Sequence, residues 1–181
     1  MRSDKGFGKL HGVLRKEVSG MGLRAIWNKL YLFLPAGVWY AVIFRLSAQT
    51  GSSSSATSGR IVYWLLEIPF LSIQSEEQHA AVLETLTFCV RKGAHMGAYF
   101  ILTALLLLAV WRLIAPPVRR AAAAAGLCAL LAGLDEFHQT FVPGRSGQVR
   151  DVFIDMAGSA CFLLLWGTMY YFFSRRRSGE K

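Results

Sequence analysis

Four long apolar stretches limit what this chain can fold into more strongly than any other feature of its sequence. They run over residues 27–44, 94–111, 121–137 and 152–173. A helix needs about 20 predominantly apolar residues to cross the roughly 30 Å hydrocarbon core of a membrane. Lipid offers the backbone no hydrogen-bond partners, so only helices and closed barrels span it, and the alternation typical of strands is missing here. The sequence therefore predicts an all-α integral membrane protein with four transmembrane helices.

Composition and charge disfavour the other broad classes of protein. Hydrophobic residues make up 54% of the 181 residues even without the 17 glycines, whereas soluble domains reach about 45–50% with glycine included. The net charge of +9 would suit a nucleic-acid-binding protein, but the charged residues avoid the apolar stretches. A soluble nucleic-acid-binding protein, a disordered tail protein and a secreted disulfide scaffold are therefore disfavoured, and nucleic acid is not an expected partner.

The positions of the basic residues predict the orientation of the helices. The N-terminal segment, the connection between the second and third stretches, and the C-terminal tail together contain 14 basic and three acidic residues, whereas the opposite side contains six basic and eight acidic ones. Because cytoplasmic segments are enriched in Lys and Arg, we expect both termini in the cytoplasm. The chain then divides into a basic leader (1–26), a membrane domain (27–173) and a basic tail (174–181). The first stretch is a signal anchor, because it is too long for a cleaved signal peptide.

The first outer connection contains three kinds of sequence. Residues 47–59 are rich in Ser, Gly and Thr, a composition that predicts a linker. Arg60 to Leu66 is aromatic and too short to span a membrane, which favours a short interfacial helix that stops near Pro69. Ser75 to Gln78 has the form of a capping box, so we expect a helix to begin near Glu76 and to run directly into the second apolar stretch.

The three cysteines, Cys89, Cys128 and Cys161, lie within or next to the apolar stretches. They show no CxxC pattern and no Cys/His spacing, so neither a zinc site nor a disulfide framework is indicated. We expect all three to be buried structural thiols.

Ionisable residues interrupt the apolar stretches at a common depth. With a rise of about 1.5 Å per residue, His95 lies about 6 Å inside the outer boundary at Arg91, and Asp135 lies about 22 Å from Arg120 at the inner one. Asp155 lies one turn inside the outer end of the fourth stretch. Three separate helices therefore bring ionisable groups to one level near the outer surface.

Helical spacing also places these groups on shared faces. The spacings of four or eight residues link Arg91, His95 and Tyr99, then Asp135 and Gln139, then Asp151 and Asp155. Ionisable groups inside a membrane are costly and normally face inward and pair. Four basic residues match four acidic ones in this cluster, namely Arg91, Lys92, Arg145 and Arg150 against Asp135, Glu136, Asp151 and Asp155. The cluster can therefore neutralise itself.

Two interpretations of this cluster remain open, a structural ion-pair network and an outward-facing functional pocket. In a functional pocket, Arg91 and Arg145 can hold a phosphate or carboxylate. A carboxylate with His95 can supply acid–base catalysis, which makes Asp135, Glu136 and His95 the catalytic candidates. A divalent metal would need Asp135, Glu136 and Asp155 with His95 or His138, but the neighbouring basic residues argue against it. We therefore expect no metal and no cofactor.

Three motifs in the chain resemble the VanZ-like family of bacterial membrane proteins. They are Arg91-Lys92-x-x-His95-x-x-x-Tyr99, Asp135-Glu136-x-x-Gln139-x-x-x-Pro143-Gly144-Arg145, and Asp151-x-x-x-Asp155-x-x-Gly158. The Ser47-Ala-Gln49 end of the first stretch is similar to a further signature of that family. The resemblance covers about residues 30 to 172 and implies a multi-pass protein of the bacterial cell membrane.

The resemblance implies a site but no catalytic role. The family's namesake is associated with low-level resistance to the glycopeptide teicoplanin, without the D-Ala-D-Lac precursor route of the main resistance enzymes. The binding residues that the motifs imply are Gln49, Arg91, Lys92, His95, Tyr99, Asp135, Glu136, Gln139, Pro143, Gly144, Arg145, Asp151 and Asp155.

Two functional hypotheses follow. In the first, an outward-facing pocket binds a cell-envelope component, such as a lipid-linked precursor or another anionic headgroup, or the glycopeptide, and influences teicoplanin susceptibility. In the second, a membrane enzyme acts on a lipid-linked phosphate at the outer leaflet, with Glu136 or Asp135 as base and Arg91 and Arg145 holding the phosphate. Membrane lipids are expected partners in both. A small transporter or channel is disfavoured, because we expect no broken central helices and the charges lie near one face of the membrane instead of its midplane.

Overall fold

The computed structural model describes residues 29–66 and 76–179, and every regular element in this part is helical. The elements in chain order are η1 (Tyr31–Phe33), α2 (Leu34–Ser47), α3 (Gly51–Leu66), α4 (Glu76–Trp111), α5 (Pro117–Gln139) and α6 (Val149–Gly179). The prediction of an all-α protein is confirmed for the described residues. The predicted basic leader and the predicted helix stop near Pro69 lie outside them.

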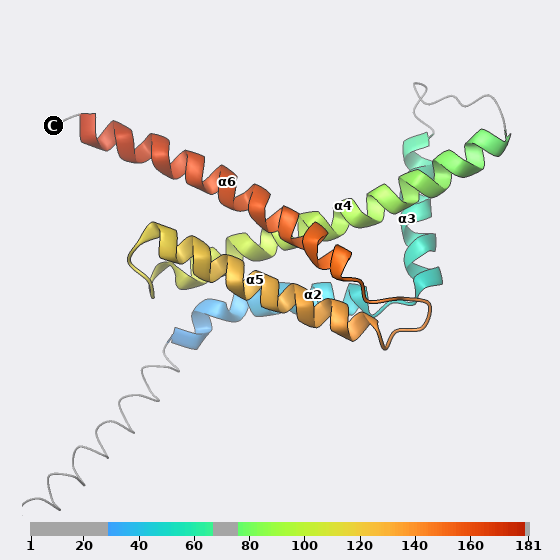
Figure 1. Cartoon of the computed structure of the whole chain (residues 1–181), viewed down its shortest axis with the longest axis horizontal. Coiled ribbons are helices and arrows are strands. Elements are labelled where there is room, and N and C mark those ends of the chain that lie inside the picture. Colours follow the sequence, from blue (N-terminus) through green and yellow to red (C-terminus); the bar gives the residue numbers. More distant parts are fainter. Residues whose placement is uncertain (1–28, 67–75, 180–181) are drawn as a thin grey trace, which may run out of the picture.

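Helix α4 is the centre of the fold, because it contacts α2, α3, α5 and α6. It crosses the first half of α6 closely near its own middle (Figure 1). The crossing depends on Gly158, where an added Cβ would lie 2.0 Å from the carbonyl oxygen of Met96. On the other side of α4, Leu102 and Leu106 belong to a buried cluster with Cys128 and Ala132 of α5.

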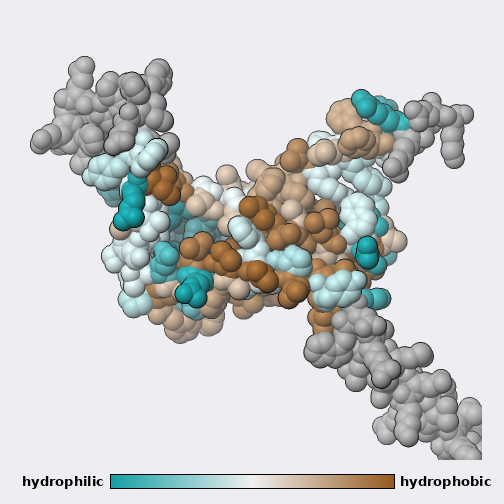
Figure 2. All heavy atoms as spheres, turned by 180° about the vertical axis from the view of Figure 1, so that it is seen from behind, coloured by the Kyte–Doolittle hydropathy of each residue, from teal (hydrophilic) through white to brown (hydrophobic). Residues whose placement is uncertain are grey.

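The outward faces of the long helices are apolar. Ala81–Trp111 of α4, Pro117–Gln139 of α5 and Val149–Arg176 of α6 each have the length and apolarity of a membrane span. Only 17% of the most apolar window is buried in α5 and in α6, against 39% in α4. Figure 2 shows that the middle of the molecule is mainly apolar and that hydrophilic side chains gather toward its two ends. These helices indicate a multi-pass membrane protein, whose exposed apolar side chains would contact lipid.

In the described part of the chain, the helix that contains the first predicted span does not qualify as a membrane span by itself. Tyr31–Ser47 passes the test for a membrane span only together with Gly51–Trp64, and the two segments are bent by 102° at the break between them. In Figure 1, α3 turns away from α2 and runs across the end of α4. The described helices thus include three that can span a membrane, or four if the bent pair counts as one.

The prediction of a linker over residues 47–59 is wrong, because most of this segment forms the first half of α3. The start of α3 is held by two backbone donors, since the Ser53 amide bonds Thr50 Oγ1 at 3.4 Å and the Gly51 amide bonds the Pro143 carbonyl at 3.3 Å. One face of α3 is buried, at Ser54, Ser58 and Val62. Close packing of these small side chains overrides a composition that would otherwise leave the segment unstructured. The predicted interfacial helix from Arg60 to Leu66 is the second half of α3.

The expectation for the cysteines is wrong at two positions. Cys128 is buried, but Cys89 and Cys161 are exposed on the surface of the chain. An apolar stretch in a membrane protein does not show which of its faces points inward, because lipid is as apolar as the protein interior. The predicted start of α4 near Glu76 is confirmed.

Gly158→Ala tests the close crossing of α4 and α6. We expect overpacking against the Met96 carbonyl to destabilise the fold by about 1–3 kcal/mol, seen as a lower midpoint of thermal unfolding in detergent. Gly167→Ala is the matched control on the same helix, because nothing lies within 4 Å of its added Cβ. The control should raise the unfolding midpoint slightly, because alanine loses less backbone entropy in a helix than glycine does. Equal midpoints for the two variants would contradict the crossing.

Candidate functional site

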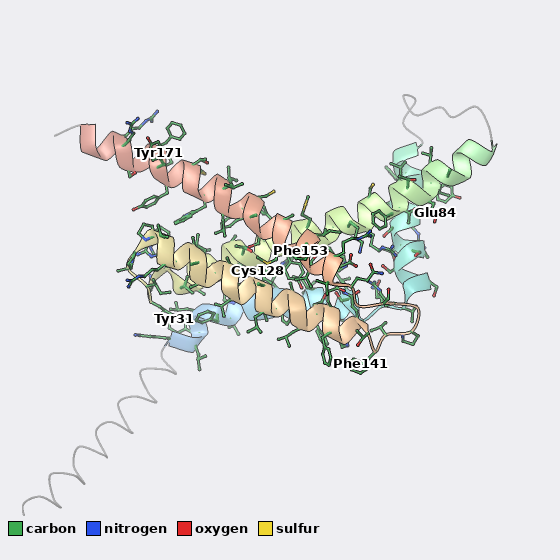
Figure 3. All side chains as sticks on the ribbon, viewed as in Figure 1. Tyr31, Glu84, Cys128, Phe141, Phe153 and Tyr171 are labelled. Carbon is green, nitrogen blue, oxygen red and sulfur yellow. The ribbon has the colours of Figure 1, made fainter. Side chains whose placement is uncertain are left out.

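One end of the bundle collects the polar residues. There α2 ends, α5 ends and α6 begins beside the first half of α4, and residues 140–148 connect α5 to α6 (Figure 1). Figure 3 shows side chains with nitrogen and oxygen atoms gathered at this end, whereas Cys128 lies farther along α5. The antiparallel course of α4, α5 and α6 therefore brings the predicted stripes of ionisable residues together.

A polar cavity of about 150 Å³ lies at this end. Its lining combines cationic, anionic and amide side chains from α4, the end of α5, the following loop and the start of α6. The residues that line it are Phe88, Arg91, Lys92, His95, Glu136, Gln139, Gly144, Arg145, Ser146, Gln148, Arg150, Asp151, Ile154 and Asp155.

Asp135 does not line this cavity, but it ties α2 to α5. Its carboxyl group is fully buried, and its Oδ2 accepts hydrogen bonds from Ser47 Oγ at 2.7 Å and from Gln139 Nε2 at 3.2 Å. The same Gln139 amide donates to Glu136 Oε1 at 2.9 Å. Because a buried carboxyl group needs such donors, the bond from Ser47 ties the last residue of α2 to this acid, whose Oδ1 is buried without a partner among the described residues.

The loop after α5 is bonded to both neighbouring helices. Arg145 donates from Nε to the Gln49 carbonyl at 3.1 Å and from Nη1 to Gln139 Oε1 at 3.0 Å. The Gln148 amide donates to Glu136 Oε2 at 3.0 Å. These bonds place the Arg145 guanidinium at the edge of the cavity and hold its direction.

Two glycines let this loop approach α3 and α5. Gly144 has a φ of +72°, in the left-handed region that favours glycine, and its carbonyl oxygen would lie 2.1 Å from a Cβ on Gly51. Gly147 lies against α5, where an added Cβ would be 2.2 Å from the Glu136 carbonyl oxygen. The turn at Pro143-Gly144 therefore brings the loop into contact with the start of α3.

Some of the basic side chains in the cavity have a carboxylate partner and others do not. Lys92 forms an ion pair with Asp151, and His95 Nδ1 lies 3.7 Å from Asp155 Oδ1. Neither Arg91 nor Arg145 has a carboxylate oxygen within 4.0 Å in the described part of the chain. Burial and the neighbouring Arg91 lower the pKa of Arg145, yet arginine remains charged in proteins. Among the described residues, three guanidinium groups therefore line the cavity without a carboxylate partner, the partly buried Arg91 and Arg145 and the exposed Arg150.

A second cavity, of about 170 Å³, adjoins the first and is lined by α2, α3 and α4. Its walls include Ile43, Leu46, Ile61, Val90, Ala94 and Ala98, together with the hydroxyl groups of Ser47, Ser54, Thr57 and Ser58. Arg91, His95 and Arg145 line both cavities.

The metal ligand set considered from the sequence is not assembled. No group of three or more His, Cys, Asp or Glu residues among the described ones is placed to hold a metal ion. The His138 ring lies 4.0 Å from the Phe44 ring, measured between centroids, and so contacts α2. The arrangement of the described side chains suits recognition of an anion by guanidinium and amide donors.

The structure brings most of the sequence-predicted residues to the polar cavity. Those that line it are Arg91, Lys92, His95, Glu136, Gln139, Gly144, Arg145, Asp151 and Asp155. Gln49 lines only the second cavity, Asp135 and Tyr99 are buried without lining either one, and Pro143 contributes its carbonyl group to the start of α3.

Sequence reasoning missed the α3 residues of the second cavity and the bond from Ser47 to Asp135. The signal for α3 was present, because Ser54, Ser58 and Val62 are four residues apart and form one helical face. The composition of the Ser-rich segment concealed this period.

Comparison with known proteins yielded one match. A family model described as VanZ/LLP1 matches residues 32–172, a range that contains every residue of both cavities. No curated protein and no solved structure matches the chain.

Gln139→Leu tests the buried network. The change leaves Asp135 and Glu136 each without one donor and Arg145 without one acceptor, and an unsatisfied buried polar group costs about 1–3 kcal/mol. We expect a clear fall in the unfolding midpoint. Gln148→Leu is the matched control, because its exposed side chain bonds only Ser146 and its backbone amide, which serves Glu136, is unchanged. A Gln139→Leu midpoint no lower than that of the control would disprove the network's structural role.

Proposed function

Because the chain belongs to the VanZ/LLP1 family, we propose that it is a VanZ-like protein of the bacterial cell membrane that influences susceptibility to glycopeptides such as teicoplanin. Its polar cavity binds an anionic group of a cell-envelope component. The observation that carries this proposal is the pair of guanidinium groups, Arg91 and Arg145, which line the cavity without a carboxylate partner in the described part of the chain.

Two guanidinium groups that line one cavity without a carboxylate partner favour an anionic ligand. Both are partly buried, where like charges repel more strongly than in water. A phosphate or carboxylate group between them would relieve this repulsion, and its oxygens would accept hydrogen bonds from the planar guanidinium N–H groups. The carboxylates of the cavity do not serve this purpose, because Asp151 pairs with Lys92 and Asp155 lies beside His95.

The size of the cavity favours a headgroup over the antibiotic itself. Pockets that enclose drug-sized ligands measure about 300–1,000 Å³, whereas this one measures about 150 Å³. A glycopeptide is larger than an ordinary drug and would not fit inside. The proposal is therefore that the protein engages an anionic headgroup at the membrane surface and thereby alters the access of a lipophilic glycopeptide to its target.

We favour binding over the alternative, an enzyme that acts on a lipid-linked phosphate. Glu136 accepts hydrogen bonds on both carboxyl oxygens, from Gln139 and from the Gln148 amide. Asp135 is engaged by Ser47 and Gln139 and does not line the cavity. The two carboxylates proposed as general bases are thus committed to holding α2, α5 and the loop together.

The proposed orientation places both cavities at the outer face of the membrane and both termini in the cytoplasm. It rests on the excess of basic residues in the segments at the opposite end of the helices. In this orientation the loop that contains Arg145 faces the cell exterior, where envelope components are assembled.

Cysteine labelling tests this orientation. In a variant without the three native cysteines, Ser146→Cys in the loop after α5 should react with a membrane-impermeant maleimide in intact cells. Ala115→Cys, in the exposed connection between α4 and α5, should react only after the cells are permeabilised. The reverse pattern would place the cavities on the cytoplasmic side and refute the proposed function.

Arg91→Gln tests the function without disturbing the fold, because Arg91 has no carboxylate partner among the described residues. Loss of a hydrogen bond to a charged group weakens binding by about tenfold or more. In cells where the protein raises teicoplanin tolerance, we expect the variant to return the minimal inhibitory concentration toward that of cells lacking the protein. Arg119→Gln, an exposed arginine at the other end of the bundle, is the matched control. Full tolerance with Arg91→Gln at normal membrane abundance would contradict the proposal.

A further inference from the structure

We propose that the ligand is a lipid with a phosphate headgroup, whose phosphate lies between Arg91 and Arg145 and whose tail begins in the second cavity. This inference rests on the proposed function and adds to it the class of ligand and a subsite for an apolar chain. The polar cavity then holds the headgroup, and the second cavity between α2, α3 and α4 holds the first part of the tail.

The polar cavity and the partly apolar second cavity adjoin each other, as the headgroup and the tail do in such a lipid. Arg91, His95 and Arg145 line both of them and form the boundary between them. In a phospholipid or a polyprenyl phosphate, the anionic phosphate likewise separates a polar headgroup or water from a long apolar chain. The two guanidinium groups occupy the position that the phosphate would have in a lipid bound across this boundary.

The second cavity suits an apolar chain. Ile43, Leu46, Ile61 and Val90 contribute aliphatic side chains to its walls. Its volume is about 170 Å³, well below the roughly 300–1,000 Å³ of pockets that enclose drug-sized ligands. It can therefore hold the first few methylene groups of a tail but no whole lipid.

The rest of the tail has a route to the surroundings of the helices. Leu46 and Ile61, from the walls of the second cavity, are 55% and 49% exposed. The cavity thus reaches the apolar outer surface, which in a membrane contacts lipid chains. A soluble phosphate compound would use none of this apolar wall, so the second cavity favours a lipid over a free phosphate.

The bend after α2 creates the second cavity. Because α3 turns by 102° from α2, its Ser54 and Ser58 face the other walls of the cavity. The bend is braced by the bond from the Gly51 amide to the Pro143 carbonyl, in the same loop that positions Arg145. One loop therefore places both the guanidinium group and the helix that completes the apolar wall.

The experiment uses the full chain in maltoside micelles, which contain no phosphate. One arm measures photocrosslinking to phosphatidic acid with a diazirine near the headgroup end of its tail, and the other arm measures binding of glycerol 3-phosphate by calorimetry. Ala94→Phe fills the second cavity and leaves both guanidinium groups in place. Ala157→Phe, at an exposed position of α6 that lines neither cavity, is the matched control. Ile61→Trp narrows the cavity from its exposed side and serves if Ala94→Phe does not fold.

We expect crosslinks from the wild-type chain and from Ala157→Phe to fall on the α2, α3 and α4 walls of the second cavity. Exclusion of even two methylene groups weakens binding about tenfold, so Ala94→Phe should lose about nine tenths of the crosslinking at a limiting lipid concentration. Its affinity for glycerol 3-phosphate should not change.

Two results would overturn the inference while leaving the proposed function intact. The first is crosslinking that neither Ala94→Phe nor Ile61→Trp reduces. The second is half-maximal crosslinking of the wild-type chain at a lipid concentration no lower than its dissociation constant for glycerol 3-phosphate. If the wild-type chain binds neither probe, the proposed recognition of a phosphate fails as well.

Discussion

The burial of the Asp135 carboxyl group is the constraint on which the arrangement of this end of the bundle depends. A carboxyl group inside an apolar bundle must receive hydrogen bonds, and here the donors come from Ser47 at the end of α2 and Gln139 at the end of α5. Gln139 also bonds Glu136 and Arg145. One buried acid therefore sets where α2 stops, how the loop after α5 returns, and where the Arg145 guanidinium lies.

The same network explains why positive charge is left over at the cavity, although the cluster contains equal numbers of acidic and basic residues. Asp135 and Glu136 accept hydrogen bonds from hydroxyl and amide groups, whereas Asp151 and Asp155 lie beside Lys92 and His95. Arg91 and Arg145 consequently have no carboxylate partner in the described part of the chain. A balance of charges in the sequence thus leaves both guanidinium groups without a carboxylate partner, because Asp135 and Glu136 are held by neutral donors.

Sequence reasoning succeeded where the physical signal is local. The start of α4 follows from a capping pattern, and the meeting of His95, Glu136 and Asp155 at one cavity agrees with their positions along the helices. It failed where the signal depends on neighbours. The Ser-rich segment resembles a linker by composition, but Ser54, Ser58 and Val62 are buried in α3. Likewise, Cys161 lies in an apolar stretch but on an exposed face, which its position in the sequence does not reveal.

The sequence by itself determined the helical class, the length and apolarity of the long helices, and the positions of the ionisable residues along them. These follow from the length of apolar runs and from helical geometry, which are properties of each segment alone. Only the tertiary structure decided that α3 turns away from α2 by 102°, that a second cavity opens beside the first, and that Arg91 and Arg145 lie between the two. These features depend on which small side chains meet a neighbouring helix and on which donors reach each buried carboxyl group, and both are settled by contacts between segments far apart in the chain.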